Sequence, residues 1–187
     1  MRIPEKIFLP KTEEFNNSAL VYTAAAWSSG TAFPSVRWNT SGTVITTASL
    51  VFGGSTGPAT PTFLNSVFAG DGTSWTAGGS TSMSSINMFG SGTQTASIAG
   101  GGLASPGSNT TSAETYNGSP WTAITVTPFA TKGAGAAGTT TAALIIGSDV
   151  PGSNNQDSYS WNGSSWSEED ALNDTFQNGA AGGPTEN

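Results

Sequence analysis

Short hydrophobic runs recur along the chain, and each is bounded by glycine, proline, serine or asparagine. Three of these runs share one pattern: TTASLVFGG at 46–54, TQTASIAGG at 93–101 and TTTAALIIG at 139–147. Such runs, rich in Thr, Val, Ile and Ala and closed by turn residues, are typical of β-strands. The nearest helical candidate, SEEDALND at 167–174, is short and predicts at most a single turn. The pattern therefore predicts an all-β chain.

A tryptophan recurs between the hydrophobic runs at nearly constant spacing. The intervals are 48, 46 and 45 residues, and the tryptophans are Trp27, Trp75, Trp121 and Trp166. The six residues that end at each one read YTAAAW, GDGTSW, YNGSPW and WNGSSW. An aromatic residue begins three of these copies, whereas the second begins with Gly70. A fixed period of this length indicates a repeat architecture.

Each repeat is predicted to form four short strands. In the third repeat these are expected at about 130–137, 141–147, 156–162 and 165–170. The Asn-Gly pairs at 117–118 and 162–163 predict type I′ hairpins, in which both central residues have positive φ. Units of four strands with a glycine-rich turn and a spaced tryptophan favour a β-propeller.

The repeat resembles the kelch repeat, in which an apolar strand ends in Gly-Gly and is followed by an aromatic residue and then a tryptophan. The resemblance covers nearly the whole chain but is loose: the third copy has Gly147-Ser148, and the step from aromatic residue to tryptophan is five residues, one shorter than usual in kelch. It implies a small four-bladed propeller forming a single domain, 1–187. The repeats would be about 28–75, 76–121 and 122–166.

The chain length predicts how such a ring would close. Trp166 is 21 residues from the C-terminus and Trp27 is residue 27, and together these make 48, one more repeat length. Residues 167–187 plus 1–27 would form the closing blade, with 1–17 as an N-terminal arm or closing strand and Ile7-Phe8-Leu9 as its apolar run. Closure of this kind hides strand edges. The alternatives are an open half-ring completed by a second copy, a β-sandwich and a β-solenoid.

The four periodic tryptophans are expected to pack between neighbouring blades. A buried tryptophan of this kind contributes roughly 3–5 kcal/mol relative to alanine. Trp38 stands outside the series and Trp161 occupies the aromatic position, so one of the two is a candidate for an exposed ligand platform.

The composition excludes several functions. The chain has 187 residues, a net charge of −7, no Cys and no His, and only 9% of its residues are charged. This composition removes disulfides, thiol nucleophiles, imidazole bases and the usual zinc and copper ligands. The five basic residues form no patch for phosphates, so nucleic acid is not an expected partner. No apolar run has the length of a signal peptide or membrane span, so neither secretion nor membrane insertion is expected.

Few residues remain for catalysis or metal binding. Glu168, Glu169 and Asp170 are the only acidic cluster, which is expected to be a solvated run and not a glycosidase pair. Asp149 and Asp157 flank PGSNNQ without any known calcium-loop spacing. A sialidase-like site needs three arginines, and the chain has only Arg2 and Arg37. We therefore predict no enzyme, cofactor, catalytic residue or metal ligand, and leave the ligand-binding residues unassigned.

A neutral surface of Thr, Ser, Asn and Gly suits a particle exterior or a module that contacts glycans. Runs such as GTQTAS and ETYNGSPW resemble the kelch-like arrays of structural proteins in marine and other environmental tailed bacteriophages. The resemblance implies a non-enzymatic virion protein on the tail, a fibre or the capsid exterior, made in the host cytoplasm and present in multiple copies. Its expected partners are other virion proteins, docked through the N-terminal arm, and a host-surface glycan or protein. The alternatives are a cellular lectin-like or scaffold propeller, and a hydrolase that uses the acidic cluster.

Overall fold

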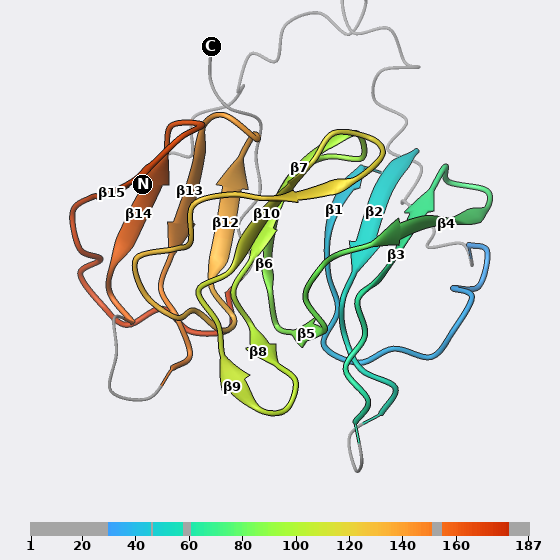
Figure 1. Cartoon of the computed structure of the whole chain (residues 1–187), viewed down its shortest axis with the longest axis horizontal. Coiled ribbons are helices and arrows are strands. Elements are labelled where there is room, and N and C mark those ends of the chain that lie inside the picture. Colours follow the sequence, from blue (N-terminus) through green and yellow to red (C-terminus); the bar gives the residue numbers. More distant parts are fainter. Residues whose placement is uncertain (1–29, 46, 58–60, 151–154, 180–187) are drawn as a thin grey trace, which may run out of the picture. The chain divides into compact units, whose positions relative to one another are not determined.

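A computed structural model of the chain describes residues 30–45, 47–57, 61–150 and 155–179. The chain divides into two units, Met1–Gly30 and Thr31–Asn187, and every described strand belongs to the second. The described residues contain β-strands joined by turns and bends, with no helix (Figure 1), and residues 169–174 are irregular. The all-β prediction is confirmed.

Three four-stranded antiparallel sheets carry the described structure, and a small three-stranded sheet accompanies them. The first sheet contains β1 (Ser41–Ile45), β2 (Ala48–Phe52), β3 (Ser66–Gly70) and β4 (Trp75–Ser80). The second sheet contains β6 (Phe89–Thr93), β7 (Ala96–Gly100), β10 (Ala113–Tyr116) and β11 (Trp121–Ala123). The third sheet contains β12 (Gly135–Gly138), β13 (Ala143–Ile146), β14 (Ser158–Trp161) and β15 (Trp166–Glu168). The small sheet contains β5 (Ser85–Ile86), β8 (Leu103–Ala104) and β9 (Ser108–Asn109).

The strand registers repeat from sheet to sheet. Leu50 pairs with Thr43, Ile98 with Ser91 and Leu144 with Ala137 at the same place in each first hairpin. All four strands expected in the third repeat are present, each shorter than its expected range, and the first begins at residue 135, not 130. The repeat read from the sequence is therefore a repeat of strand pairing.

A glycine follows the second strand of each four-stranded sheet for a conformational reason. Gly53, Gly101 and Gly147 have φ values of 65°, 62° and 64°, a backbone conformation that residues other than glycine rarely adopt. The residue after each glycine donates its backbone N–H to a later carbonyl: Gly54 to Ser85, Gly102 to Thr131 and Ser148 to Phe176. The chain is thereby turned out of the sheet and fixed to the segment that leads to the next one.

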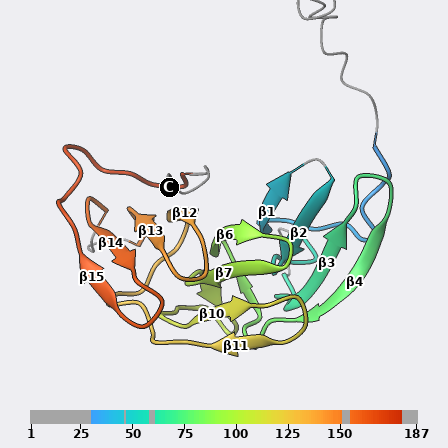
Figure 2. The same ribbon diagram turned by 90° about the horizontal axis from the view of Figure 1, so that it is seen from above.

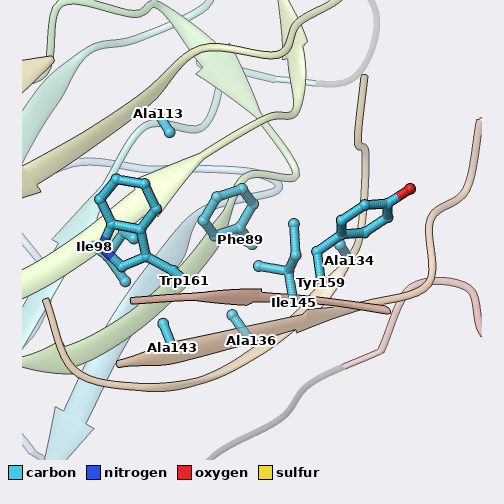
Figure 3. Close-up of a cluster of buried hydrophobic side chains, with 9 residues drawn as sticks. All are labelled: Phe89, Ile98, Ala113, Ala134, Ala136, Ala143, Ile145, Tyr159 and Trp161. Atoms are coloured by element: carbon cyan, nitrogen blue, oxygen red, sulfur yellow. The ribbon is translucent and has the colours of Figure 1, made fainter. Parts of the chain in front are cut away.

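The three sheets pack side by side around their first strands. Figure 2 shows β1, β6 and β12 toward the middle and β4, β11 and β15 on the outside, and β6 packs against both β1 and β12. The core between the first and second sheets contains Leu50, Phe52, Val67, Met83, Met88, Ala99 and Tyr116. The core between the second and third sheets, drawn in Figure 3, contains Phe89, Ile98, Ala113, Ala134, Ala136, Ala143, Ile145, Tyr159 and Trp161. Each large aliphatic side chain buried there contributes about 1.5–3 kcal/mol.

A series of backbone hydrogen bonds joins successive repeats near these first strands. Asn87 N–H donates to Asn39 C=O at 3.1 Å, Gly133 N–H to Asn87 C=O at 2.9 Å, and Gly179 N–H to Gly133 C=O at 3.2 Å. The four positions are 48, 46 and 46 residues apart. The first three each precede a first strand by two residues. Gly179 is thus the fourth position of the same series.

Equivalent leucine and isoleucine positions differ in burial. Leu50 and Ile98 are both 0% exposed because the next sheet covers them. Leu144 has the same register position in the third sheet and is 39% exposed. The predicted closing blade, residues 167–187 plus 1–27, and its run Ile7-Phe8-Leu9 fall largely on residues 1–29 and 180–187, which lie outside the described residues.

Candidate functional site

The repeated hairpin loops are built alike. They join the third and fourth strands of each sheet and comprise residues 71–74, 117–120 and 162–165. Each begins with Asp or Asn, and positive φ falls on the glycine that follows: 88° at Gly72, 96° at Gly118 and 93° at Gly163. The type I′ prediction is therefore wrong, because Asn117 and Asn162 do not have positive φ.

The side chain of the first loop residue explains this turn. Asn162 Oδ1 accepts hydrogen bonds from the backbone N–H groups of Ser164 and Ser165, at 3.0 and 2.9 Å. Asn162 N–H in turn donates to Ser165 C=O. A short polar side chain that binds its own turn fixes the loop and leaves Asn162 in an ordinary conformation.

Asp71 makes the same turn with a carboxylate. Its Oδ1 accepts the backbone N–H groups of Thr73 and Ser74 at 2.8 and 2.6 Å, as well as the Thr73 hydroxyl, and its Oδ2 accepts the Ser74 hydroxyl. The backbone N–H of Thr73, followed by the other three donors, holds the pKa of Asp71 well below its ordinary value. Asp71 is therefore a structural carboxylate of the loop.

Two of the three tryptophans that follow these loops pack between sheets, as predicted. Trp121 lies 5.3 Å from Phe52 of the first sheet, and Trp166 lies 6.2 Å from Phe89 of the second, both edge-on. Trp75 contacts Phe33 at 4.8 Å, and Phe33 precedes the first sheet. Trp27 lies outside the described residues.

Two of these tryptophans also donate a hydrogen bond from the indole N–H to a backbone carbonyl. Trp166 Nε1 donates to Thr125 C=O at 3.0 Å, and Trp75 Nε1 donates to Thr31 C=O at 3.4 Å. Each acceptor is four residues after the tryptophan of the preceding repeat. The Thr125 hydroxyl donates to Ser164 C=O, and the Thr31 hydroxyl makes the equivalent bond to Thr73 C=O. We call each such set, a threonine bound to the next loop and tryptophan, a threonine clasp.

The acidic cluster lies on the surface. Glu168, Glu169 and Asp170 are all exposed, and Glu169 accepts a hydrogen bond from the Ser160 hydroxyl. Within the described part of the chain, no three carboxylate, histidine or cysteine side chains converge as metal ligands would. Asp149 instead pairs with Lys132 at 3.1 Å, and Asp157 accepts the Gly147 N–H through its backbone carbonyl.

Arg37 is turned inward, which the sequence did not predict. Its guanidinium donates to Gly53 C=O at 2.8 Å and to Ser66 C=O at 3.0 Å, and further bonds reach the hydroxyls of Ser35 and Ser66. It also lies over the Phe68 ring, 4.9 Å from the centroid. Burial lowers the pKa of Arg37. The side chain thus fixes the segment that enters the first sheet.

Two hollows bear on how the sheets pack. One, of about 230 Å3, lies where β1, β6 and β12 meet and is lined by Met88 and Phe89 together with small residues such as Gly42, Gly90 and Ala136. The other, of about 300 Å3, lies on the first sheet between Phe33, Val51 and Trp75. The positions equivalent to Val51 and Trp75 are Ala99 and Trp121, and those are packed against the first sheet. The second hollow therefore lies on the face of the first sheet that corresponds to a buried contact face of the second sheet.

Glu114 is a buried carboxylate that the sequence analysis missed. It is 2% exposed and accepts the Ser82 backbone N–H, 3.1 Å from each carboxylate oxygen, and the Ser82 hydroxyl. Phe68 and Tyr159 occupy the equivalent register positions in the other sheets. Glu114 therefore bonds the second sheet to the segment that contains Ser82. The other two sheets have an aromatic side chain at this position.

Of the two candidate platform tryptophans, only Trp38 is accessible. Trp161 is 3% exposed and donates its Nε1–H to Thr140 C=O at 2.9 Å. Trp38 is 48% exposed, and Val36 on the same segment is 77% exposed. The exposed pair of Val36 and Trp38 is the strongest candidate for a contact with another molecule.

No protein-family model matches the sequence, and no curated protein matches it. None of the described segments forms a helix with the length and apolarity that crossing a bilayer requires.

Proposed function

We propose that the chain is a closed four-bladed propeller of kelch-like repeats that serves as a non-enzymatic structural protein on a tailed-phage particle. The three four-stranded sheets would be three blades, and the terminal segments would supply the fourth. The particle role rests in addition on the resemblance of the repeats to phage proteins and on the low share of charged residues, 9%.

Two observations support the fourth blade. Gly179 continues the backbone series that begins at Asn39, so a fourth inner strand would start just after it. The exposed Leu144 and the hollow beside Trp75 are the two sheet faces that a further blade would cover. The equivalent faces are buried where the first sheet meets the second and where the second meets the third. A fourth blade would therefore bury two exposed apolar surfaces at once.

Deletion of residues 1–12 tests closure within one chain. Loss of a closing strand should lower the melting temperature, and the deleted protein should gain dye-accessible apolar surface. An unchanged melting temperature would contradict closure by this segment. Light scattering on the intact chain separates the alternatives, since a ring completed between copies requires a dimer.

The surface role is carried by one observation, the chemistry of the repeated loops. Residues 71–74, 117–120 and 162–165 are all exposed, and they offer hydroxyl, amide and backbone groups on rigid turns with Asp71 as the single carboxylate. Such groups form many weak hydrogen bonds. Display in multiple copies on one particle would multiply their combined affinity.

Immunogold electron microscopy of purified particles, with antibody to this protein, tests the particle role. Discrete label on tails, fibres or capsid vertices is the expected result. Unlabelled particles would overturn the proposal and leave a cellular glycan-binding or scaffold propeller as the alternative.

A further inference from the structure

The segment that enters the first sheet displays its apolar side chains and turns its charged one toward the protein. Val36 and Trp38 are 77% and 48% exposed, whereas Arg37 between them is partly buried and bonded to Gly53 and Ser66. Large exposed apolar side chains next to a partly buried charge reverse the usual arrangement, and such a reversal points to a contact surface.

The segment is held rigidly. Trp38 and Ser55 exchange backbone hydrogen bonds of 3.0 and 2.9 Å, and the bonds of Arg37 to Gly53 and Ser66 fix the residue before it. A ligand that binds the indole would therefore not have to order this segment, which reduces the entropy lost on binding.

Comparison between the repeats shows that the exposed indole has no counterpart. The equivalent pair in the second repeat is Ile86 opposite Leu103, two apolar side chains. In the third repeat, Lys132 and Asp149 form an ion pair at 3.1 Å. Directly opposed side chains share one face and stabilise each other. Trp38 instead faces the small, buried Ser55, so most of its apolar surface has no partner across the ladder.

The described residues that flank Trp38 along the chain and on the segment paired with it are mostly polar. Those that are exposed with hydroxyl or amide side chains are Ser35, Asn39, Thr40, Thr56 and Thr62. Arg37, the charged residue of this segment, uses its guanidinium inside the protein. An indole with hydroxyl and amide neighbours matches a sugar ring, which has an apolar C–H face and a rim of hydroxyls.

We propose that Trp38, with Val36 beside it, is a stacking platform for a neutral saccharide of a surface glycan. The indole would pack against the C–H face of the ring, and the neighbouring Ser, Thr and Asn side chains would bond its hydroxyls. This inference rests on the proposed surface role and names the class of partner for it.

Saturation-transfer NMR on the full chain tests the platform with neutral hexasaccharides of glucose, mannose, galactose and N-acetylglucosamine, and with sialyllactose as an anionic probe. At least one neutral probe should bind. Trp38→Ala should weaken that binding about tenfold or more, the effect typical of a central aromatic contact. Trp38→Tyr should retain part of the affinity because a ring remains.

Val126→Ala is the matched control, since Val126 is 55% exposed elsewhere on the surface and should leave binding unchanged. Circular dichroism should show that all three variants are folded. The inference is overturned if no neutral probe binds, if only sialyllactose binds, or if Trp38→Ala binds like the parent protein. Particle labelling is a separate result: labelled particles without saccharide binding overturn only the platform, whereas saccharide binding with unlabelled particles overturns only the virion role.

Discussion

The indole N–H of Trp166 donates to the main-chain carbonyl of Thr125 at 3.0 Å, across the contact between the second and third sheets. Thr125 follows Trp121 by four residues, and Thr31 stands four residues after Trp27 and accepts the same bond from Trp75. The residue four positions after Trp75 is Gly79, which has no hydroxyl, and Trp121 Nε1 is buried without a partner in the described structure. The threonine clasp is thus present in two of the three described repeats.

Replacing Trp166 and Trp121 by Phe separates the clasp from the packing of the ring. Trp166→Phe removes a hydrogen bond of roughly 0.5–1.5 kcal/mol, whereas Trp121→Phe removes an N–H whose burial is unfavourable. Trp166→Phe should therefore lower the free energy of unfolding by about 1 kcal/mol more than Trp121→Phe. Urea unfolding measures both, and equal losses would show that the indole bond contributes nothing.

Glu114→Ala should destabilise the protein by roughly 1–3 kcal/mol, because it removes the buried carboxylate that accepts hydrogen bonds from the Ser82 N–H and hydroxyl. The control is Glu168→Ala, which removes an exposed carboxylate and should change stability by less than about 0.5 kcal/mol. Thermal and urea unfolding of both variants give the comparison. A Glu114→Ala protein as stable as the control would contradict the structural role assigned to this carboxylate.

Asp71 should affect stability in acid. Because its pKa in the folded chain is lowered, the stabilisation from the ionised carboxylate is present above the unfolded pKa, about 4, and is lost as the pH falls through the folded pKa. Asp71→Asn should keep the turn, since Asn117 and Asn162 occupy the same loop position, but should be less stable than the parent at pH 7 because an amide N–H2 cannot accept the Ser74 hydroxyl. It should also remove this contribution to acid sensitivity.

Stability measured between pH 7 and pH 2 tests the variant, and carboxyl NMR shows the titration of Asp71 directly. A titration of Asp71 at the ordinary aspartate value would contradict the hydrogen bonding described for the loop. Asp174→Asn changes a different exposed aspartate and serves as the control.

Gly90 is required by the close approach of two sheets. A β-carbon at this position would lie 2.5 Å from Phe52 Cζ, so Gly90→Ala should cost about 1–3 kcal/mol through overpacking. Adding Phe52→Leu should recover part of that loss by shortening the opposing side chain. Gly57→Ala is the control because its β-carbon would meet no atom within 4 Å. If Gly90→Ala and Gly57→Ala unfold at the same urea concentration, the contact is not tight.

The repeat was visible in the sequence because its constraints recur at fixed spacing. The tryptophans follow the hairpin loops, and glycines such as Gly53 and Gly101 have positive φ, so both positions allow few residue types. From these the strands and the packing role of Trp121 and Trp166 could be predicted. The small sheet of β5, β8 and β9 could not, because strands of two residues carry no detectable alternation.

Other features depended on three-dimensional neighbours. A single glutamate is ordinarily exposed, and only the arrangement of Ser82 against Glu114 makes its burial favourable. Asn-Gly predicts a type I′ turn from backbone preference alone, whereas the Asn162 side chain binds the turn itself and changes its geometry. The sequence reduced the platform candidates to Trp38 and Trp161, and burial distinguishes the two.

The series of bonds that joins Asn39, Asn87, Gly133 and Gly179 uses only backbone atoms. The side chains next to this series can consequently differ from repeat to repeat. The residues just before Asn39, Asn87 and Gly133 are a tryptophan, an isoleucine and a lysine. Each repeat can therefore present a different side chain at the same place in the fold, as Trp38 and Lys132 do, while the connection between the sheets stays the same.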